Sequence, residues 1–211
     1  MILIFDTETN GLPRGDYIPK LVQLSLLFTE ETGIERGFVN LIIKPDGWSI
    51  PKEAIAKHGI TEEIAHKYGI PEAMALSIWH KYMKMSTMIV GHNVNFDMTI
   101  MKGAYNTVKN YTPSIQNFGS FDDIIKGKEI NCTLEMCTPI LKISPTRRMV
   151  EAGIRSEYKS PNLSECYKYF FNETFNAHNA GDDVRATARI FFHLLNSVDT
   201  TKSVDNASKD W

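Results

Sequence analysis

Two acidic residues, Asp6 and Glu8, stand at the end of the apolar run that opens the chain, within the stretch IFDTETNGLP (residues 4–13). Residues two positions apart project from the same face of a strand, so these carboxylates would lie side by side while Thr7 points away. Carboxylates a few Å apart repel each other and raise each other's pKa unless a cation lies between them. The pattern therefore predicts a divalent metal site at a strand end. A solvated strand end is the alternative for an isolated Asp-x-Glu.

The second stretch, GHNVNFD (residues 91–97), follows a later apolar run and brings Asp97 near the start of a predicted helix. Helix capping is the alternative here, with Asn93 or Asn95 as the N-cap and Asp97 favourable in the first turn. The capping role and a metal-binding role are compatible.

The third stretch, HNAGDD (residues 178–183), precedes and begins an amphipathic helix. Asp183 lies in the first turn on the flank of the apolar stripe, so it can face the end of the sheet while Val184 packs beneath it. For an isolated His-x4-Asp, the alternative is a loop histidine at His178 and an aspartate favoured by the helix dipole.

A sheet must bring these stretches together, and the chain contains suitable strand patterns. The run at residues 2–6 ends at the turn signal formed by residues 10–13, which suits a buried central strand. Two β-rich runs on either side of residues 30–33 predict an antiparallel hairpin. The predicted strands cover residues 2–6, 21–29, 35–44, 88–90 and 130–133.

Helical patterns separate and follow these strands. The clearest covers residues 181–197, where Val184, Ala188, Phe191 and Leu195 form the apolar stripe of a helix that lies on a sheet. Residues 110–128 read as a polar loop. The other predicted helices are a short one between Pro51 and His58 and longer ones at residues 72–85, 95–108, 134–141 and 163–171.

In this order, FDTETNGLP, GHNVNFD and HNAGDD resemble the three exonuclease motifs of the DEDDh 3′–5′ exonucleases. That family includes the epsilon proofreading subunit of bacterial DNA polymerase, ribonuclease T, oligoribonuclease and the mammalian three-prime repair exonucleases. The resemblance extends to about residue 196. It implies an α/β, ribonuclease H-like fold, with a five-stranded mixed sheet flanked by helices and an antiparallel second strand, and the predicted order of elements agrees.

The resemblance also implies a catalytic histidine and four acidic metal ligands, at His178 and at Asp6, Glu8, Asp97 and Asp183. Asp182 competes with Asp183 for the last ligand position. We prefer Asp183, because the motif places its aspartate five residues after the histidine. Asp182 would lie about 100° away around the helix.

Such a cluster is suited to two divalent cations, Mg²⁺ or Mn²⁺, about 3.5–4 Å apart on the scissile phosphate. One ion would lower the pKa of a bound water and the other would stabilise the leaving 3′ oxygen, with Asp6 as the expected bridge between them. His178 suits a general base, because an imidazole titrates near pH 6.5. The expected product is a nucleoside 5′-monophosphate.

By resemblance, Thr7, Gly11 and Leu12 lie where the family packs the 3′-terminal nucleotide, and Asn93 matches a position near it. Leu12 is either a wedge against the terminal base or an ordinary hydrophobic cover of the turn. We expect Phe96 in the core rather than stacked on a base. The expected substrate is a single-stranded 3′ end, because a stacked duplex would withhold its terminal nucleotide. DNA is favoured over RNA, and an RNA-specific exoribonuclease is the alternative.

The segment at residues 142–159 carries five basic residues and two acidic ones. A basic loop of this kind beside the site could contact the substrate backbone. A solvated loop without that function is the alternative.

Composition sets the remaining expectations for the 211-residue chain. A net charge of −2 provides no overall attraction to nucleic acid, so contacts must come from a local basic patch or bound cations. The three cysteines form no CxxC pair, which predicts buried thiols in a cytoplasmic protein. No signal peptide or membrane helix is predicted.

We expect one exonuclease domain at residues 1–197 and a flexible polar tail at residues 198–211. The tail ends in Trp211 and could dock a DNA polymerase or another replication partner. Two other function classes are possible for this fold: an inactive nucleic-acid-binding or polymerase-tethering module, and an endonuclease or transposase. An inactive module would not need all four carboxylates and the histidine, and an endonuclease would lack the His-x4-Asp unit.

Overall fold

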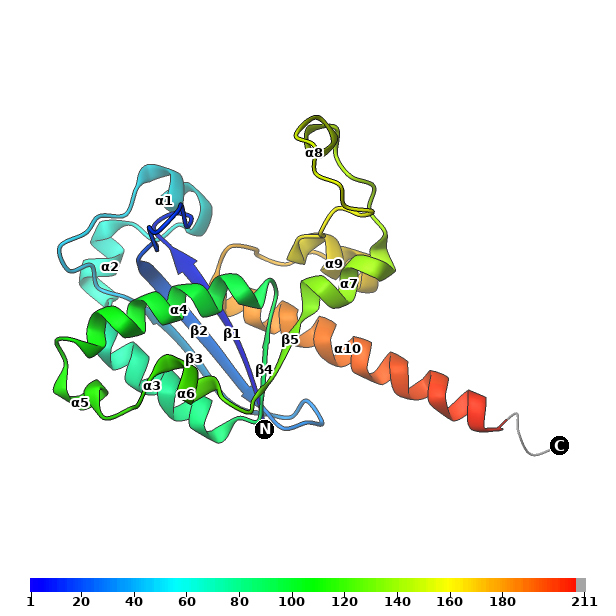
Figure 1. Cartoon of the computed structure of the whole chain (residues 1–211), viewed down its shortest axis with the longest axis horizontal. Helices are drawn as coiled ribbons and strands as arrows, with labels where there is room; N and C mark the ends of the chain where they lie inside the picture. Colours follow the sequence, from blue (N-terminus) through cyan, green and yellow to red (C-terminus); the bar gives the residue numbers. More distant parts are fainter. Residues whose placement is uncertain (208–211) are drawn as a thin grey trace.

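A mixed sheet of five strands forms the centre of the molecule (Figure 1). The strands are β1 (Ile2–Thr9), β2 (Leu21–Thr29), β3 (Glu35–Ile42), β4 (Met88–Gly91) and β5 (Glu129–Cys132). Across the sheet their order is β3-β2-β1-β4-β5. Strand β2 is antiparallel to both of its neighbours, whereas β1, β4 and β5 are parallel. The predicted fold class, with its antiparallel second strand, is confirmed.

The computed structural model describes the backbone of residues 1–207 and the side chains of these residues except 114 and 198–207. No helix in this part of the chain has an apolar stretch that could span a membrane. The helices are α1 (Lys52–His58), α2 (Glu62–Tyr68), α3 (Glu72–Met85), α4 (Val94–Lys109), α5 (Pro113–Gln116), α6 (Phe121–Ile125), α7 (Thr133–Leu141), α8 (Arg147–Glu151), α9 (Leu163–Phe171) and α10 (Ala180–Ala207).

Helices cover both faces of the sheet, and the alternation of side chains along β1 shows how. Leu3 and Phe5 belong to the core shared with α3 and α4. Ile2 and Ile4 point to the other face and pack against α10. Strand β1 is therefore apolar on both faces until its last residues, which is why it reads as an uninterrupted apolar run.

Helix α10 packs on the sheet through the stripe that the sequence predicts. Val184, Ala188 and Phe191 are buried with residues of β1, β2 and β4, and Leu195 packs against the edge of this cluster. The N-terminus of α10 is also held by Gln23 of β2, whose Oε1 accepts a hydrogen bond from the backbone N–H of Ala180 (3.2 Å). These contacts fix the first turn of α10 relative to β1.

Some short elements differ from the sequence predictions. Residues 110–128 were expected to form a loop, but they contain α5 and α6, and residues 62–68 form the unpredicted helix α2. Both α2 and α6 are too short to show a helical period, and each is started by a side-chain cap. Thr61 accepts a hydrogen bond from the N–H of Ile64, and Ser120 accepts one from the N–H of Asp123.

Helix α10 extends past the predicted C-terminal end of the domain. Helix α10 continues to Ala207, past residue 197, where the sequence places the end of the domain. Residues 208–211, with the docking residue proposed at Trp211, lie outside the described part of the chain. The three cysteines are buried and free, as expected.

Candidate active site

The carboxyl end of β1 carries the first acidic motif. Asp6 and Glu8 project toward α10, and Thr7 projects toward α4, because successive residues of a strand point to opposite faces. Strand β4 runs parallel to β1 and ends at the same edge of the sheet, where the chain enters α4. The first two motifs therefore meet at one end of the sheet.

Asp6, Glu8 and Asp183 form one acidic cluster. Each offers a carboxylate oxygen, and these oxygens lie within 4.8 Å of one another. Asp183 comes from the first turn of α10, and the next residue, Val184, is buried in the core beneath it. The structure thus brings residues of the first and third motifs together.

Asp97, from the second motif, is 2% exposed and lies beside this cluster. Its Oδ1 accepts hydrogen bonds from the backbone N–H of Thr7 (2.9 Å) and from the Thr7 hydroxyl (2.6 Å). Asn93 occupies the N-cap position of α4, but its side chain makes no capping hydrogen bond. The contact with Thr7 ties α4 to β1 and holds Asp97 at the strand end.

The electrostatics of the four carboxylates are those of a crowded anionic site. Burial and the three neighbouring carboxylates raise the pKa of Asp6 well above its ordinary range. Burial, with the charges of Asp183 and Asp97, raises the pKa of Glu8 to about 7, although Lys57 lowers it. Burial also raises the pKa of Asp183 to about 7. For Asp97, burial raises the pKa more than the hydrogen bonds from Thr7 lower it.

This donor set fits a divalent metal. Carboxylate oxygens are the ligands that Mg²⁺ and Mn²⁺ prefer, and three of them converge within 4.8 Å. A cation between the carboxylates would relieve the repulsion that raises their pKa values. An acidic cluster suited to divalent metal is therefore present at the end of β1.

His178 lies in the loop before α10, with its side chain exposed and its backbone in the left-handed region (φ 67°). Its backbone N–H donates a hydrogen bond to Oδ2 of Asp183 (3.0 Å), which attaches the loop to the cluster. Asp182 instead accepts a hydrogen bond from Nδ2 of Asn176 (3.0 Å). Of the two adjacent aspartates, Asp183 is the one that joins Asp6 and Glu8.

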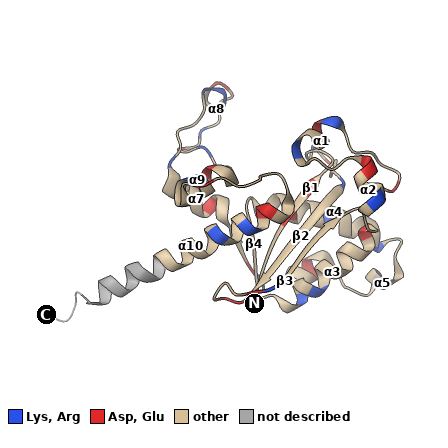
Figure 2. Ribbon diagram, turned by 180° about the vertical axis from the view of Figure 1, so that it is seen from behind, with Lys and Arg blue, Asp and Glu red and all other residues tan. Residues whose placement is uncertain are grey.

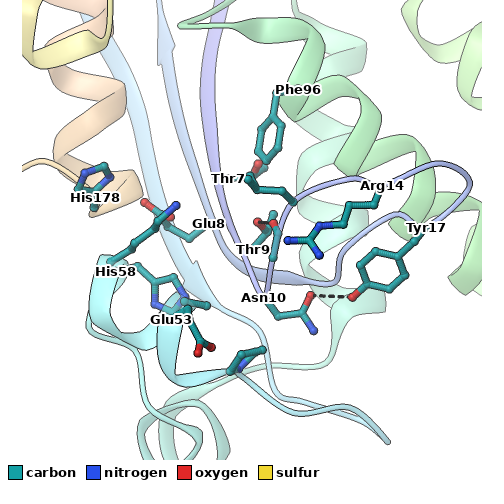
Figure 3. A pocket seen from close by; sticks show the side chains of 15 residues that line it. Thr7, Glu8, Thr9, Asn10, Arg14, Tyr17, Glu53, His58, Phe96 and His178 are labelled. Carbon is teal, nitrogen blue, oxygen red and sulfur yellow. Dashed lines mark hydrogen bonds between the residues drawn. The ribbon is translucent and has the colours of Figure 1, made fainter. Parts of the chain in front are cut away.

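Two adjoining cavities open at the cluster. The smaller, of about 270 Å³, is lined by all four carboxylates. The larger, of about 670 Å³, extends from Glu8 toward α1 and the loop that follows β1 (Figure 3). The residues that line both are Thr7, Glu8, Phe96 and His178. Of the catalytic candidates, Glu8 and His178 therefore stand at the junction of the two cavities, and Asp6, Asp97 and Asp183 line the smaller one.

Some of the predicted nucleotide-contacting residues line these cavities, and one does not. Thr7, Gly11 and Leu12 line the larger cavity. Asn93 is exposed and lines neither cavity. Phe96, expected in the core, packs against the core cluster and also faces both cavities. The prediction for Phe96 was therefore incomplete, because its position at the start of α4 leaves one side of the ring uncovered.

Several residues around the cavities were not singled out from the sequence. Lys57 and His58, at the end of α1, and Arg14 and Tyr17, after β1, line the larger cavity. Figure 3 shows Arg14 and Tyr17 across the cavity from His178. The short helix opened by Pro51 was predicted, but no local pattern indicates that its end packs beside β1.

Residues 3–191 match the family model described as exonuclease, of the RNase T type. This match covers most of the chain. The chain belongs to the exonuclease family. The resemblance of its three motifs to those of the DEDDh 3′–5′ exonucleases is thereby confirmed. A comparison with curated protein sequences finds no match.

Solved exonuclease structures share the fold. The zinc-bound complex of E. coli exonuclease I with single-stranded DNA is 21% identical with a TM-score of 0.70, over 94% of this chain and 42% of that one. Exonuclease I of Methylocaldum szegediense is 20% identical with a TM-score of 0.65, over 93% and 40%. Exonuclease X in complex with 5′ overhanging duplex DNA is 19% identical with a TM-score of 0.55, over 93% and 92%. The chain thus spans less than half the length of the exonuclease I structures.

Proposed function

We propose that the protein is a 3′–5′ exonuclease that removes nucleoside 5′-monophosphates from single-stranded 3′ ends, with DNA preferred over RNA. The observation that carries this proposal is the convergence of carboxylates from three separate motifs at the end of β1, beside His178. Membership of the exonuclease family supports the reaction class.

In this proposal Asp6, Glu8, Asp97 and Asp183 hold two divalent cations, Mg²⁺ or Mn²⁺. Bound there, the ions would supply an activated water and stabilise the negative charge that develops on the leaving 3′ oxygen. The chain's own contribution is the fixed position of the four carboxylates. Thr7 holds Asp97 through two hydrogen bonds, and the backbone N–H of His178 holds Asp183.

His178 acts as the general base and takes the proton from the attacking water. Its imidazole is exposed and lines both cavities, so it can face a phosphate bound at their junction. The hydrogen bond from its backbone to Asp183 keeps the loop at the cluster while the side chain stays free to turn. General base catalysis of this kind contributes about 10²- to 10⁴-fold to a rate.

The 3′-terminal nucleotide occupies the larger cavity in this proposal. Thr7, Gly11 and Leu12 line it on the side of β1, and Phe96 offers an aromatic face. The contact expected for Asn93 stays a prediction, since this residue lies outside both cavities. The preference for DNA is supported by the fold neighbours, of which E. coli exonuclease I was solved with single-stranded DNA. A polymerase partner is not part of the proposal.

Digestion of single-stranded oligonucleotides labelled at the 5′ end tests this function. DNA and RNA of the same sequence are incubated with Mg²⁺, with Mn²⁺ or with chelator, and Asp6→Asn serves as the inactive control. We expect a metal-dependent ladder that shortens from the 3′ end, faster on DNA, with mononucleotides as product. Binding without cleavage of either substrate would instead identify an inactive nucleic-acid-binding module.

A further inference from the structure

Residues 142–159, between α7 and α9, form a basic arm that contains α8. Figures 1 and 2 show α8 and its flanking segments standing clear of the rest of the molecule, beyond the end of the sheet at which β1 terminates. The arm carries five basic and two acidic residues, a net charge of +3 in a chain whose net charge is −2. The remaining residues therefore carry a net charge of −5, so the arm is basic within an acidic molecule.

The root of the arm is attached to the rim of the smaller cavity. The backbone N–H of Lys159 donates to the carbonyl of Ile143 (2.8 Å), which closes the arm at its neck. The Lys159 ammonium donates to both carboxylate oxygens of Glu165, each at 2.6 Å. Glu165 and Asn162 cap the start of α9 reciprocally, and Asn162 lines the cavity that holds the four carboxylates.

A second contact joins this root to the sheet. His92, directly after β4, lies between the carbonyl of Pro161 (Nε2, 3.1 Å) and the hydroxyl of Thr133 (Nδ1, 3.0 Å). His92 also lines the smaller cavity. The neck of the arm is therefore held at a fixed place beside the acidic cluster.

The arm itself offers unpaired positive charge. Arg147 pairs with Glu151, and Lys159 with Glu165. Lys142, Arg148 and Arg155 are exposed, and among the described side chains none forms an ion pair with them.

Large apolar side chains are exposed among these cations. Val150 is 65% exposed and Ile154 is 52% exposed. Val150 and Ile154 lie within two positions of Arg148 and Arg155 in the chain.

We propose that the basic arm binds the sugar-phosphate backbone of the single-stranded substrate on the 5′ side of the nucleotide being removed, through Lys142, Arg148 and Arg155. The inference rests on the proposed exonuclease function. With the terminal nucleotide in the larger cavity on the side of α1, the rest of the strand leaves the cluster past the smaller cavity. The arm stands at that rim, and it supplies cationic contacts beside the smaller cavity, whose lining holds four carboxylates and no lysine or arginine.

The test compares two triple variants. One is Lys142→Gln, Arg148→Gln and Arg155→Gln in the arm. The matched control is Lys81→Gln, Lys84→Gln and Lys126→Gln, which removes the same charge from exposed positions that line neither cavity. Binding is measured by fluorescence anisotropy in an Asp183→Asn background, with an oligodeoxythymidylate of about 12 nucleotides and with the dinucleotide. Hydrolysis of the p-nitrophenyl ester of thymidine 5′-monophosphate, which reaches no farther than the site, is measured in the active background.

We expect the arm variant to bind the longer oligonucleotide at least about 10-fold more weakly at low salt. The slope of log affinity against log salt should flatten by about 2, since each phosphate contact to a single strand contributes about 0.7. Dinucleotide binding and ester hydrolysis should stay within about twofold of the control. Equal affinity and salt slope in both triple variants would overturn the inference. A loss of ester hydrolysis in the arm variant as large as its loss of oligonucleotide binding would also overturn it, because it would indicate a damaged site.

If the parent protein hydrolyses neither ester nor oligonucleotide with Mg²⁺ or Mn²⁺, the proposed function fails. The binding comparison still decides the inference about the arm in that case.

Discussion

Asp6 and Glu8 lower the stability of the metal-free protein, because folding brings like charges together in a partly buried place. Their pKa values are raised by burial and by the neighbouring carboxylates. A carboxyl group with a raised pKa favours the folded state when protonated and disfavours it when ionised. At the residue scale, the cluster is an arrangement suited to metal binding rather than to stability.

Glu8→Gln should therefore stabilise the metal-free protein in a pH-dependent way. The pKa of Glu8 is about 7 when folded, against an ordinary value of 4.5. The gain in the free energy of unfolding over wild type should be near zero below pH 4.5 and grow as the pH rises from 4.5 to about 7. It should level off above about pH 8, at on the order of 2 kcal/mol. Chemical unfolding of both proteins with chelator measures it. A difference in unfolding free energy that is independent of pH would contradict the raised pKa of Glu8.

His178→Gln should lower kcat on single-stranded DNA by about 10²-fold or more, because it removes the proposed base. The backbone hydrogen bond to Asp183 does not depend on the side chain, so the acidic cluster should stay formed. Metal-induced stabilisation of the variant, followed by thermal unfolding, should therefore match that of wild type. Wild-type kcat in the variant would exclude His178 as the base.

At the element scale, β1 connects the two sides of the site. Its even-numbered carboxylates face α10, and its odd-numbered Thr7 faces α4 and binds Asp97. The network of Gln23, Asn40 and Ser25 on β2 and β3 holds the start of α10 through Ala180. A shift of either helix against β1 would thus move a carboxylate out of the cluster.

Thr7→Val tests the coupling of α4 to β1. The variant keeps the shape of the side chain but loses the hydroxyl that donates to Asp97 at 2.6 Å. We expect kcat/KM to fall about 10-fold, in proportion to one lost charge-assisted hydrogen bond. Thr7→Ser retains a hydroxyl and should recover most of the activity. Wild-type activity in Thr7→Val, with a loss only in Thr7→Ser, would show that the methyl group matters and the hydrogen bond does not.

The elements with a strong period were predictable from the sequence, and the short ones were not. The apolar stripe from Val184 to Leu195 predicts α10, because about three turns of helix repeat the same spacing. Helices α2 and α6 are too short for such a repeat, and only the caps at Thr61 and Ser120 mark them.

The candidate site was predictable where local motifs carry it. The motifs indicate the carboxylates and His178 directly. The approach of Lys57 and His58 to the larger cavity depends on how α1 packs in the folded chain, and no local pattern encodes that.

At the scale of the whole molecule, the charges are separated. The acidic cluster lies at the end of β1, and the basic residues 142–159 project beyond the same end of the sheet (Figures 1 and 2). An acidic site that must accept a polyanion needs cations, either bound or supplied by the chain. Bound metal and the arm fill these two roles in the proposal.

Metal should stabilise the whole fold. A ligand that binds only the folded state adds about 2.7 kcal/mol at 100 times its dissociation constant, so Mn²⁺ or Mg²⁺ should raise the melting temperature of wild type by several degrees. Asp6→Asn should lose most of that shift, because Asp6 lies in the acidic cluster. Scanning calorimetry with metal and with chelator measures both. An equal shift in the two proteins would mean that metal binds elsewhere.

The most direct test of the central claim compares Asp183→Asn with Asp182→Asn. The two residues are neighbours on α10, but only Asp183 joins Asp6 and Glu8, whereas Asp182 binds Asn176. The measurement is a time course of single-stranded DNA labelled at the 5′ end, with Mn²⁺. We predict that Asp183→Asn abolishes the 3′-to-5′ ladder and that Asp182→Asn retains it. A ladder that survives in Asp183→Asn, or is lost equally in both variants, would contradict the acidic cluster as the catalytic centre.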